Sequence, residues 1–161
     1  MTVRTEPLPD TSRLDAWIRF LRAHAALTRE LSADLVAEHG LTINDYEVLL
    51  HLSRAPERKM RRVDLAESVL LTASGITRLL EGLERSGLVE RVHCDSDRRV
   101  VYARLTAAGS DKLRRASRTH VAGIESLFVG HYSDDELATL SSLLSRLPAA
   151  GGEDVECTDE S

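Results

Sequence analysis

The sequence contains few aromatic residues and few glycines, and it lacks the long apolar segments of membrane-spanning and secreted proteins. Aromatic residues make up 4% of the 161 residues, and there are only nine glycines. The core must therefore consist mainly of Leu, Val, Ile and Ala, a mixture that favours helices. No apolar run reaches the length of about 18 residues that a membrane-spanning helix needs. The N-terminus also lacks the apolar segment of a secretory signal.

Catalytic and metal-binding chemistry lacks its usual residue patterns as well. The two cysteines, Cys94 and Cys157, are not spaced as a disulfide framework, which favours a reducing cytoplasm. No two of the six histidines are three or four residues apart on one expected helix, so we predict no metal site. No nucleophile and base pair or glycine-rich phosphate loop is present. We therefore predict a protein that is not an enzyme and has no cofactor.

The net charge of −5 hides an uneven distribution along the chain. The last eleven residues, GGEDVECTDES, contain five acidic residues and no basic ones, which leaves residues 1–150 neutral. Between Arg54 and Arg104 there are eleven Arg and Lys against eight Asp and Glu, a local excess of +3. The middle third of the chain is thus the segment suited to a polyanionic partner, although a solvated face of mixed charge has the same composition.

The hydrophobic pattern predicts mostly helices. A long helix begins at Thr11 and ends at Gly40, and a Thr42 and Asp45 capping box opens a second helix that ends before Pro56. Two further pairs of elements follow: a short amphipathic segment at 63–71 with a helix at 72–87, and two strands at 88–92 and 100–105. Thr106 begins a helix that extends to about Val129, and a Ser133 and Glu136 capping box begins a final helix that ends at Leu147.

Two short helices followed at once by a hairpin with arginines at its tip predict a winged helix-turn-helix. The fold class is mainly α with a small β-hairpin wing. The sequence at this point resembles the multiple-antibiotic-resistance-regulator (MarR) family of bacterial transcription factors. The resemblance covers roughly Leu14 to Leu147 and is carried by the order and spacing of these motifs: Leu65-Ala66-Glu67, Ser74-Gly75-Ile76-Thr77-Arg78, Leu83 to Arg91, Asp95-Ser96-Asp97-Arg98-Arg99, Leu105-Thr106 and Gly109.

The resemblance implies an interlocked helical homodimer that binds a pseudo-palindromic operator in double-stranded DNA. It divides the chain into a flexible arm (1–10), a helical dimerisation region (11–40 and 107–147), a winged helix-turn-helix (41–106) and a disordered acidic tail (148–161). The apolar residues of the terminal helices agree with a dimer, because a monomer would expose them; an intramolecular bundle is the alternative. They are Leu14, Trp17, Ile18 and Leu21 in the first helix and Leu137, Leu140, Leu143, Leu144 and Leu147 in the last.

The second helix of the helix-turn-helix carries the first set of candidate DNA contacts. Ser74, Thr77 and Arg78 lie on the face opposite its apolar residues, where hydroxyls reach phosphates or base edges and Arg pairs with guanine. Thr72 is expected to cap the helix, and a capping hydroxyl also holds a phosphate. Alternatively, the hydroxyls only serve the helix N-terminus and Arg78 pairs with Glu81 or Glu84.

The hairpin tip carries the second set. Arg98 and Arg99 suit the enhanced negative potential of a narrow minor groove. In the family pattern the preceding acid orients one arginine through a salt bridge, which gives Asp97 a positioning role. The sequence does not determine which arginine enters the groove. A solvated charged turn is the alternative.

A small aromatic or planar anionic effector is a further implication of the resemblance. The family commonly holds such a ligand in the cleft between the dimer base and the wing lobe. Trp17, His24 and His51 would offer an aromatic wall and imidazole donors there. Trp17 and Asp64 would fill the places of the tryptophan and the acid in the urate-responsive branch. In the alternative, Trp17 is core and the histidines are surface or interface polar groups.

We therefore predict a dimeric, sequence-specific DNA-binding regulator, a repressor relieved by such a ligand. The alternatives are a winged helix that binds protein rather than DNA, and a DNA-binding regulator that needs no ligand.

Overall fold

The computed structural model describes residues 11–69, 71–94 and 99–147. The expected arm and acidic tail, together with Leu70 and residues 95–98, lie outside these ranges. The chain divides into two units, residues 1–123 and 124–161, which are described separately below. Among the described residues, no helix has the length and apolarity required to cross a membrane.

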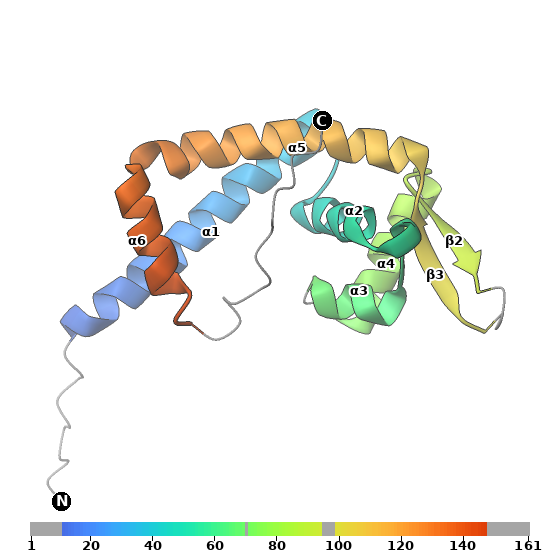
Figure 1. The fold of residues 1–161 in the computed structure, drawn as a ribbon, viewed down its shortest axis with the longest axis horizontal. Coiled ribbons are helices and arrows are strands. Elements are labelled where there is room, and N and C mark those ends of the chain that lie inside the picture. Colours follow the sequence, from blue (N-terminus) through green and yellow to red (C-terminus); the bar gives the residue numbers. More distant parts are fainter. Residues whose placement is uncertain (1–10, 70, 95–98, 148–161) are drawn as a thin grey trace, which may run out of the picture. The chain divides into compact units, whose positions relative to one another are not determined.

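Among its described residues, the first unit contains four helices, three strands and most of a fifth helix, as the sequence pattern largely predicts (Figure 1). Its elements are α1 (Thr11–His39), α2 (Ile43–Arg54), the 3-10 turn η1 (Pro56–Arg58), β1 (Lys59–Arg61), α3 (Arg62–Ser68), α4 (Ala73–Arg85), β2 (Val89–His93), β3 (Val101–Leu105) and α5 (Ala107–Leu127). Helix α5 continues into the second unit.

The helices begin and end at the residues that the sequence marks. The Thr42 hydroxyl accepts the Asp45 N–H at 3.2 Å, and the Asp45 carboxylate accepts the Thr42 N–H at 2.8 Å, which confirms the predicted capping box at α2. Gly40 follows α1 with φ +66°, and Gly87 follows α4 with φ +72°. Both glycines occupy the left-handed conformation that ends many helices.

The sheet has one strand more than the sequence analysis predicts. Strand β3 is central, with β2 and β1 antiparallel on its two sides. Met60 in β1 is paired with Ala103, and Arg61 with Tyr102. We predicted only the hairpin, because three residues within a basic segment are too few to show the alternation by which strands are identified.

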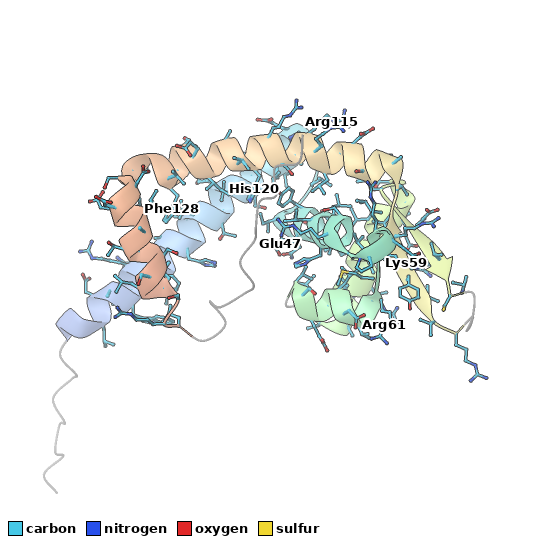
Figure 2. The ribbon with its side chains drawn as sticks, in the orientation of Figure 1. Glu47, Lys59, Arg61, Arg115, His120 and Phe128 are labelled. Atoms are coloured by element: carbon cyan, nitrogen blue, oxygen red, sulfur yellow. The ribbon has the colours of Figure 1, made fainter. Side chains whose placement is uncertain are left out.

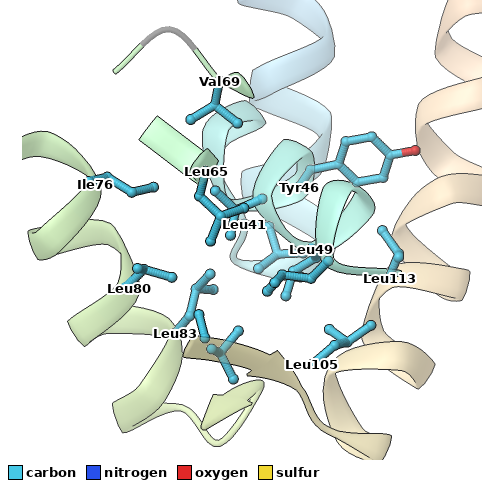
Figure 3. Close-up of a cluster of buried hydrophobic side chains, with 14 of the residues drawn as sticks. Leu41, Tyr46, Leu49, Leu65, Val69, Ile76, Leu80, Leu83, Leu105 and Leu113 are labelled. Carbon is cyan, nitrogen blue, oxygen red and sulfur yellow. The ribbon is translucent and has the colours of Figure 1, made fainter. Parts of the chain in front are cut away.

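Helices α2, α3 and α4 pack with the sheet around one apolar core. Figure 3 shows leucines and an isoleucine from α2, α3, α4 and β3 converging on this centre. Leu49 and Leu65 have no exposed surface, and Ile76 is 1% exposed. Because Ile76, Leu80 and Leu83 are the buried residues of α4, the core fixes which face of that helix remains in solvent.

A close backbone approach joins the hairpin to α5. The Thr106 N–H donates to the Leu88 carbonyl at 3.1 Å, and the Thr106 hydroxyl accepts the Gly109 N–H at 2.9 Å. A Cβ added at Gly109 would lie 2.1 Å from the Leu88 oxygen. Only glycine therefore fits at this position without displacement of the backbone.

The first half of α1 lacks a packing partner in its own unit. Every side chain from Leu14 to Ala25 is exposed. We call the four predicted residues of this helix the α1 apolar face, and their exposed fractions range from 41% to 56%: Leu14, Trp17, Ile18 and Leu21. The alternative in which Trp17 belongs to the core of its own chain is wrong, since Trp17 is the most exposed of the four.

The second unit contains the end of α5, the turn η2 (Val129–His131) and α6 (Asp134–Leu144). The predicted Ser133 and Glu136 capping box is present, with the Ser133 N–H donating to the Glu136 carboxylate at 2.9 Å. Helix α6 ends three residues earlier than predicted, so Leu147 lies in a following turn. None of the residues in α6 is buried.

Candidate nucleic-acid interface

Helix α4 presents a polar face to solvent next to the sheet. Its strongly one-sided pattern buries Ile76, Leu80 and Leu83, which turns the opposite face toward solvent. The exposed residues on that face are Ser74, Arg78, Glu81 and Arg85. A short helix held by its apolar side, with an exposed and partly cationic outer side, is the geometry of a helix that enters a DNA major groove.

The hydroxyls at the start of α4 form a connected group. Thr72 caps the helix by accepting the Gly75 N–H at 3.1 Å, as predicted, and its oxygen lies 3.3 Å from the Ser74 hydroxyl. Thr77 is half-buried and donates its hydroxyl proton to the Ala73 carbonyl at 2.7 Å. Thr77 thus has its oxygen lone pairs available but must rotate before it donates to a phosphate.

Arg78 is an exposed cation of this helix. Neither of the two acids considered as its partner holds it, because Glu84 instead accepts from Arg91 at 2.8 Å and Glu81 receives no ion pair among the described residues. Arg78 is exposed and likewise has no ion pair within the part of the chain that the structure describes. Its guanidinium therefore reaches solvent without the cost of breaking a salt bridge.

The wing carries a further exposed arginine. Arg99 is exposed at the start of the segment that leads into β3. Asp97 and Arg98, the other two predicted wing residues, lie outside the described ranges. An ion pair joins the two wing strands: Arg104 of β3 donates to Glu90 of β2 at 2.9 Å.

A groove of about 360 Å³ separates α4 from the wing. Thr77, Leu80 and Glu84 line it from α4, and Tyr102 lines it from β3. Four arginines surround it: Arg61, Arg62, Arg91 and Arg99. The Asp64 carboxylate accepts two hydrogen bonds from Arg61, at 2.9 and 3.1 Å, and raises the pKa of that guanidinium. Hydrogen bonding to Glu84 raises the pKa of Arg91 in the same way.

The candidate effector residues lie on three helices. Trp17 and His24 are exposed on α1, whereas the half-buried His51 belongs to α2. Asp64 belongs to α3, where it is paired with Arg61. An apolar hollow of about 800 Å³ is lined by α1 and the start of α2, and His24 is the one of these four residues that contributes to it.

Two features near these sites are not predicted from the sequence. Phe20 lies between Trp17 and His24, with ring centroids 6.2 and 6.4 Å from theirs, so the three rings form one row. A spacing of three or four residues on a helix is the signal that would have identified it. The second feature is the gathering of arginines around the groove. These arginines contribute to the basic excess of the middle third, but only the pairing of β1 with β3 places Arg61 beside the wing.

Comparison with known proteins identifies the family. The family model described as MarR family matches residues 39–100. The transcriptional repressor YetL of Bacillus subtilis is 31% identical over 111 residues, which span 69% of this chain and 66% of YetL.

Two solved structures from Streptomyces coelicolor extend this similarity over the described fold. AbsC, a MarR family transcriptional regulator, is 34% identical with a TM-score of 0.78, covering 88% of this chain and 95% of AbsC. Sco3205, a MarR family regulator solved in complex with DNA, is 26% identical with a TM-score of 0.79, covering 89% and 90%. The chain belongs to the MarR family of transcriptional regulators.

Proposed function

We propose that this protein is a homodimeric repressor that binds a pseudo-palindromic operator, with α4 in the major groove and the wing in the adjacent minor groove. The observation that carries the proposal is the exposed face of α4, where Arg78 has no ion pair in the described structure. Two similar proteins support the proposal: Sco3205 was solved in complex with DNA, and YetL is named a transcriptional repressor. In this proposal the protein acts on chromosomal DNA in the cytoplasm and regulates transcription rather than catalysing a reaction.

The decisive experiment is a fluorescence-polarisation titration on duplex DNA from upstream of the protein's own gene. We expect salt-sensitive binding that prefers this DNA over a scrambled duplex. Arg78→Ala should weaken binding by about 1–3 kcal/mol and relax the preference at particular base pairs. Binding without sequence preference, or none, would instead favour a winged helix that contacts protein.

Residues of the wing should affect binding differently. In our proposal Arg98 and Arg99 enter the minor groove and Asp97 orients one of them. Changing both arginines to Ala should weaken binding to all duplexes by a similar factor and lower the dependence on salt. If the double variant binds like the wild type, the wing is not a DNA-binding element.

Dimerisation follows from the exposed α1 apolar face and from α6, which contains no buried residue. Burial of both across a twofold axis would remove this apolar surface from water and place two copies of α4 about one DNA turn apart. Deleting residues 133–161 should give a chain that aggregates or fails to dimerise, whereas deleting 150–161 should leave the dimer intact. A well-behaved monomer in sedimentation of the full chain would contradict the dimer.

The regulatory ligand in our proposal is a small aromatic or planar anion that binds beside α1. The row of Trp17, Phe20 and His24 offers stacking surfaces, and the neighbouring apolar hollow offers volume. His51 of α2 and Asp64 of α3 would complete the site. Since Trp17 is the only tryptophan, salicylate-like or urate-like compounds should quench its fluorescence saturably and shift the operator titration. If neither signal changes, a regulator that needs no ligand is the better description.

A further inference from the structure

The groove between α4 and the wing is a cationic surface. As a whole, it belongs to neither of the two sets of predicted DNA contacts. It lies between the two elements that the proposed function places on DNA. Its arginines come from three separate places in the sequence: the junction of β1 and α3, strand β2, and the segment that leads into β3. Figure 2 labels Arg61 beside α3 and Lys59 beside the sheet.

The arginines of the groove differ in the charge that they have available. Arg61 is held by two hydrogen bonds to Asp64, and Arg91 is held by Glu84. Arg62 adjoins this pair, is exposed, and has no ion pair among the described residues. Of the groove arginines that precede α4, Arg62 is therefore the one whose charge is not already neutralised by a carboxylate.

The geometry of duplex DNA specifies what must occupy this groove. A major groove and the minor groove next to it are separated by a single sugar–phosphate strand. If α4 lies in the first and the wing in the second, that strand has to pass between α4 and the wing, which is where the groove lies. Its phosphates then come opposite the rim to which Arg62 belongs.

We propose that Arg62 binds a phosphate of this intervening strand and thereby fixes the register of the two reading elements on the duplex. The inference rests on the proposed function, because it requires α4 and the wing to occupy adjacent grooves. A phosphate contact carries no base information, so Arg62 contributes affinity and position but no sequence preference. Arg61 and Arg91 keep their carboxylate partners and shape the walls of the groove.

The test compares three variants of the full chain by polarisation, on the operator and on a scrambled duplex, over a series of KCl concentrations. Arg62→Gln removes the charge, and Arg62→Lys keeps it. Arg115→Gln is the matched control, since Arg115 is an exposed arginine of α5 with no ion pair in the described structure. Figure 2 shows Arg115 on the side of α5 away from Arg61. Melting temperature and sedimentation confirm that each variant is a folded dimer.

A dimer contains two copies of Arg62, so Arg62→Gln should reduce the slope of log affinity against log salt by about 1.8. If binding is equal near 1 M salt, this slope corresponds to about 60-fold weaker binding near 0.1 M. The loss should be the same on both duplexes, Arg62→Lys should retain most of the wild-type slope, and Arg115→Gln should retain nearly all of it.

Two results would overturn the proposal while the wild type still binds its operator selectively. One is an unchanged slope in Arg62→Gln, and the other is a loss confined to the operator, which would indicate a base contact. A wild-type protein with no preference for the operator would overturn the proposed function itself.

Discussion

The lobe formed by residues 41–106 and the first half of α1 use the same kinds of apolar residue in opposite ways. In the described structure the buried hydrophobic side chains all lie between Leu35 and Ala116, and most of them belong to the lobe. In contrast, α1 leaves Trp17 and its apolar neighbours in solvent. The lobe is thus stabilised by contacts within one chain, whereas α1 has the surface of an element that becomes buried only when a second chain is present.

Matched leucine truncations should separate these two kinds of stability most strongly. Leu49 has no exposed surface, so Leu49→Ala should cost about 2–5 kcal/mol of unfolding free energy and speed amide hydrogen exchange throughout the lobe. Leu21 is 44% exposed, so Leu21→Ala should leave exchange in the lobe unchanged and shift the monomer–dimer equilibrium in sedimentation. Equal loss of lobe protection in both variants would contradict the comparison.

Glycine substitutions should sharpen the comparison where the lobe joins α5. Gly109→Ala forces a Cβ against the Leu88 carbonyl and should destabilise the protein by about 1–3 kcal/mol in urea unfolding. Gly82→Ala is the control, because its added Cβ meets no atom within 4 Å and lies inside α4. That variant should be neutral or stabilised by up to about 1 kcal/mol. A stable Gly109→Ala protein would show that the junction relaxes easily.

A capping box in each of the two units allows the same kind of change in both. Thr42→Ala and Ser133→Ala each remove a hydroxyl that accepts a backbone N–H, at a cost of about 0.5–2 kcal/mol. Hydrogen exchange should show the loss at α2 and the rest of the lobe for Thr42→Ala. For Ser133→Ala the loss of protection should be confined to α6 and the dimer interface. Loss of lobe protection in Ser133→Ala would mean that α6 supports the lobe within one chain.

The smallest expected effect concerns His120 of α5, whose ring packs 4.7 Å from that of Tyr46. Its Nδ1 is buried without a hydrogen-bond partner among the described residues, and burial lowers the pKa of His120 below the ordinary value of 6.5. The unfolded chain therefore takes up a proton at a higher pH than the folded one. Stability should be fully present above pH 6.5 and decrease as the pH falls below it.

Melting temperatures between about pH 8 and pH 5 test this expectation. His120→Gln removes the titrating ring and should flatten the part of the profile below pH 6.5 relative to the wild type. If His120→Gln retains the wild-type acid sensitivity, other groups cause it.

Local sequence signals account for most of the fold. Thr42, Ser133, Gly40 and Gly87 each mark a helix boundary through interactions within four residues, so the chemistry of the residue and its neighbours suffices. Strand β1 depends instead on pairing with β3, more than 40 positions away by the register of Met60 and Ala103. Such a pairing leaves no local trace in a three-residue segment, which is why it was not predicted.

The sequence predicts which residues form the candidate interface but not which of its charged side chains form ion pairs. The sequence placed Ser74 and Arg78 on the outer face of α4 through helical periodicity, and both are exposed there. It could not determine that Glu84 pairs with Arg91 rather than with Arg78, because that choice depends on how β2 folds back beside α4. Whether Arg61 or Arg62 pairs with a carboxylate likewise depends on the geometry around Asp64.

Strand β1 has a mechanical consequence for how the protein selects an operator. It connects the segment before α3 to the wing through β3, and Lys59 adds a cation–π contact with Tyr102 at 5.4 Å. Swinging the wing relative to α4 would require breaking this ladder, so we expect the lobe to move as one rigid body. Changes in dimer geometry then alter the distance between half-sites, while the spacing read within each half-site stays constant.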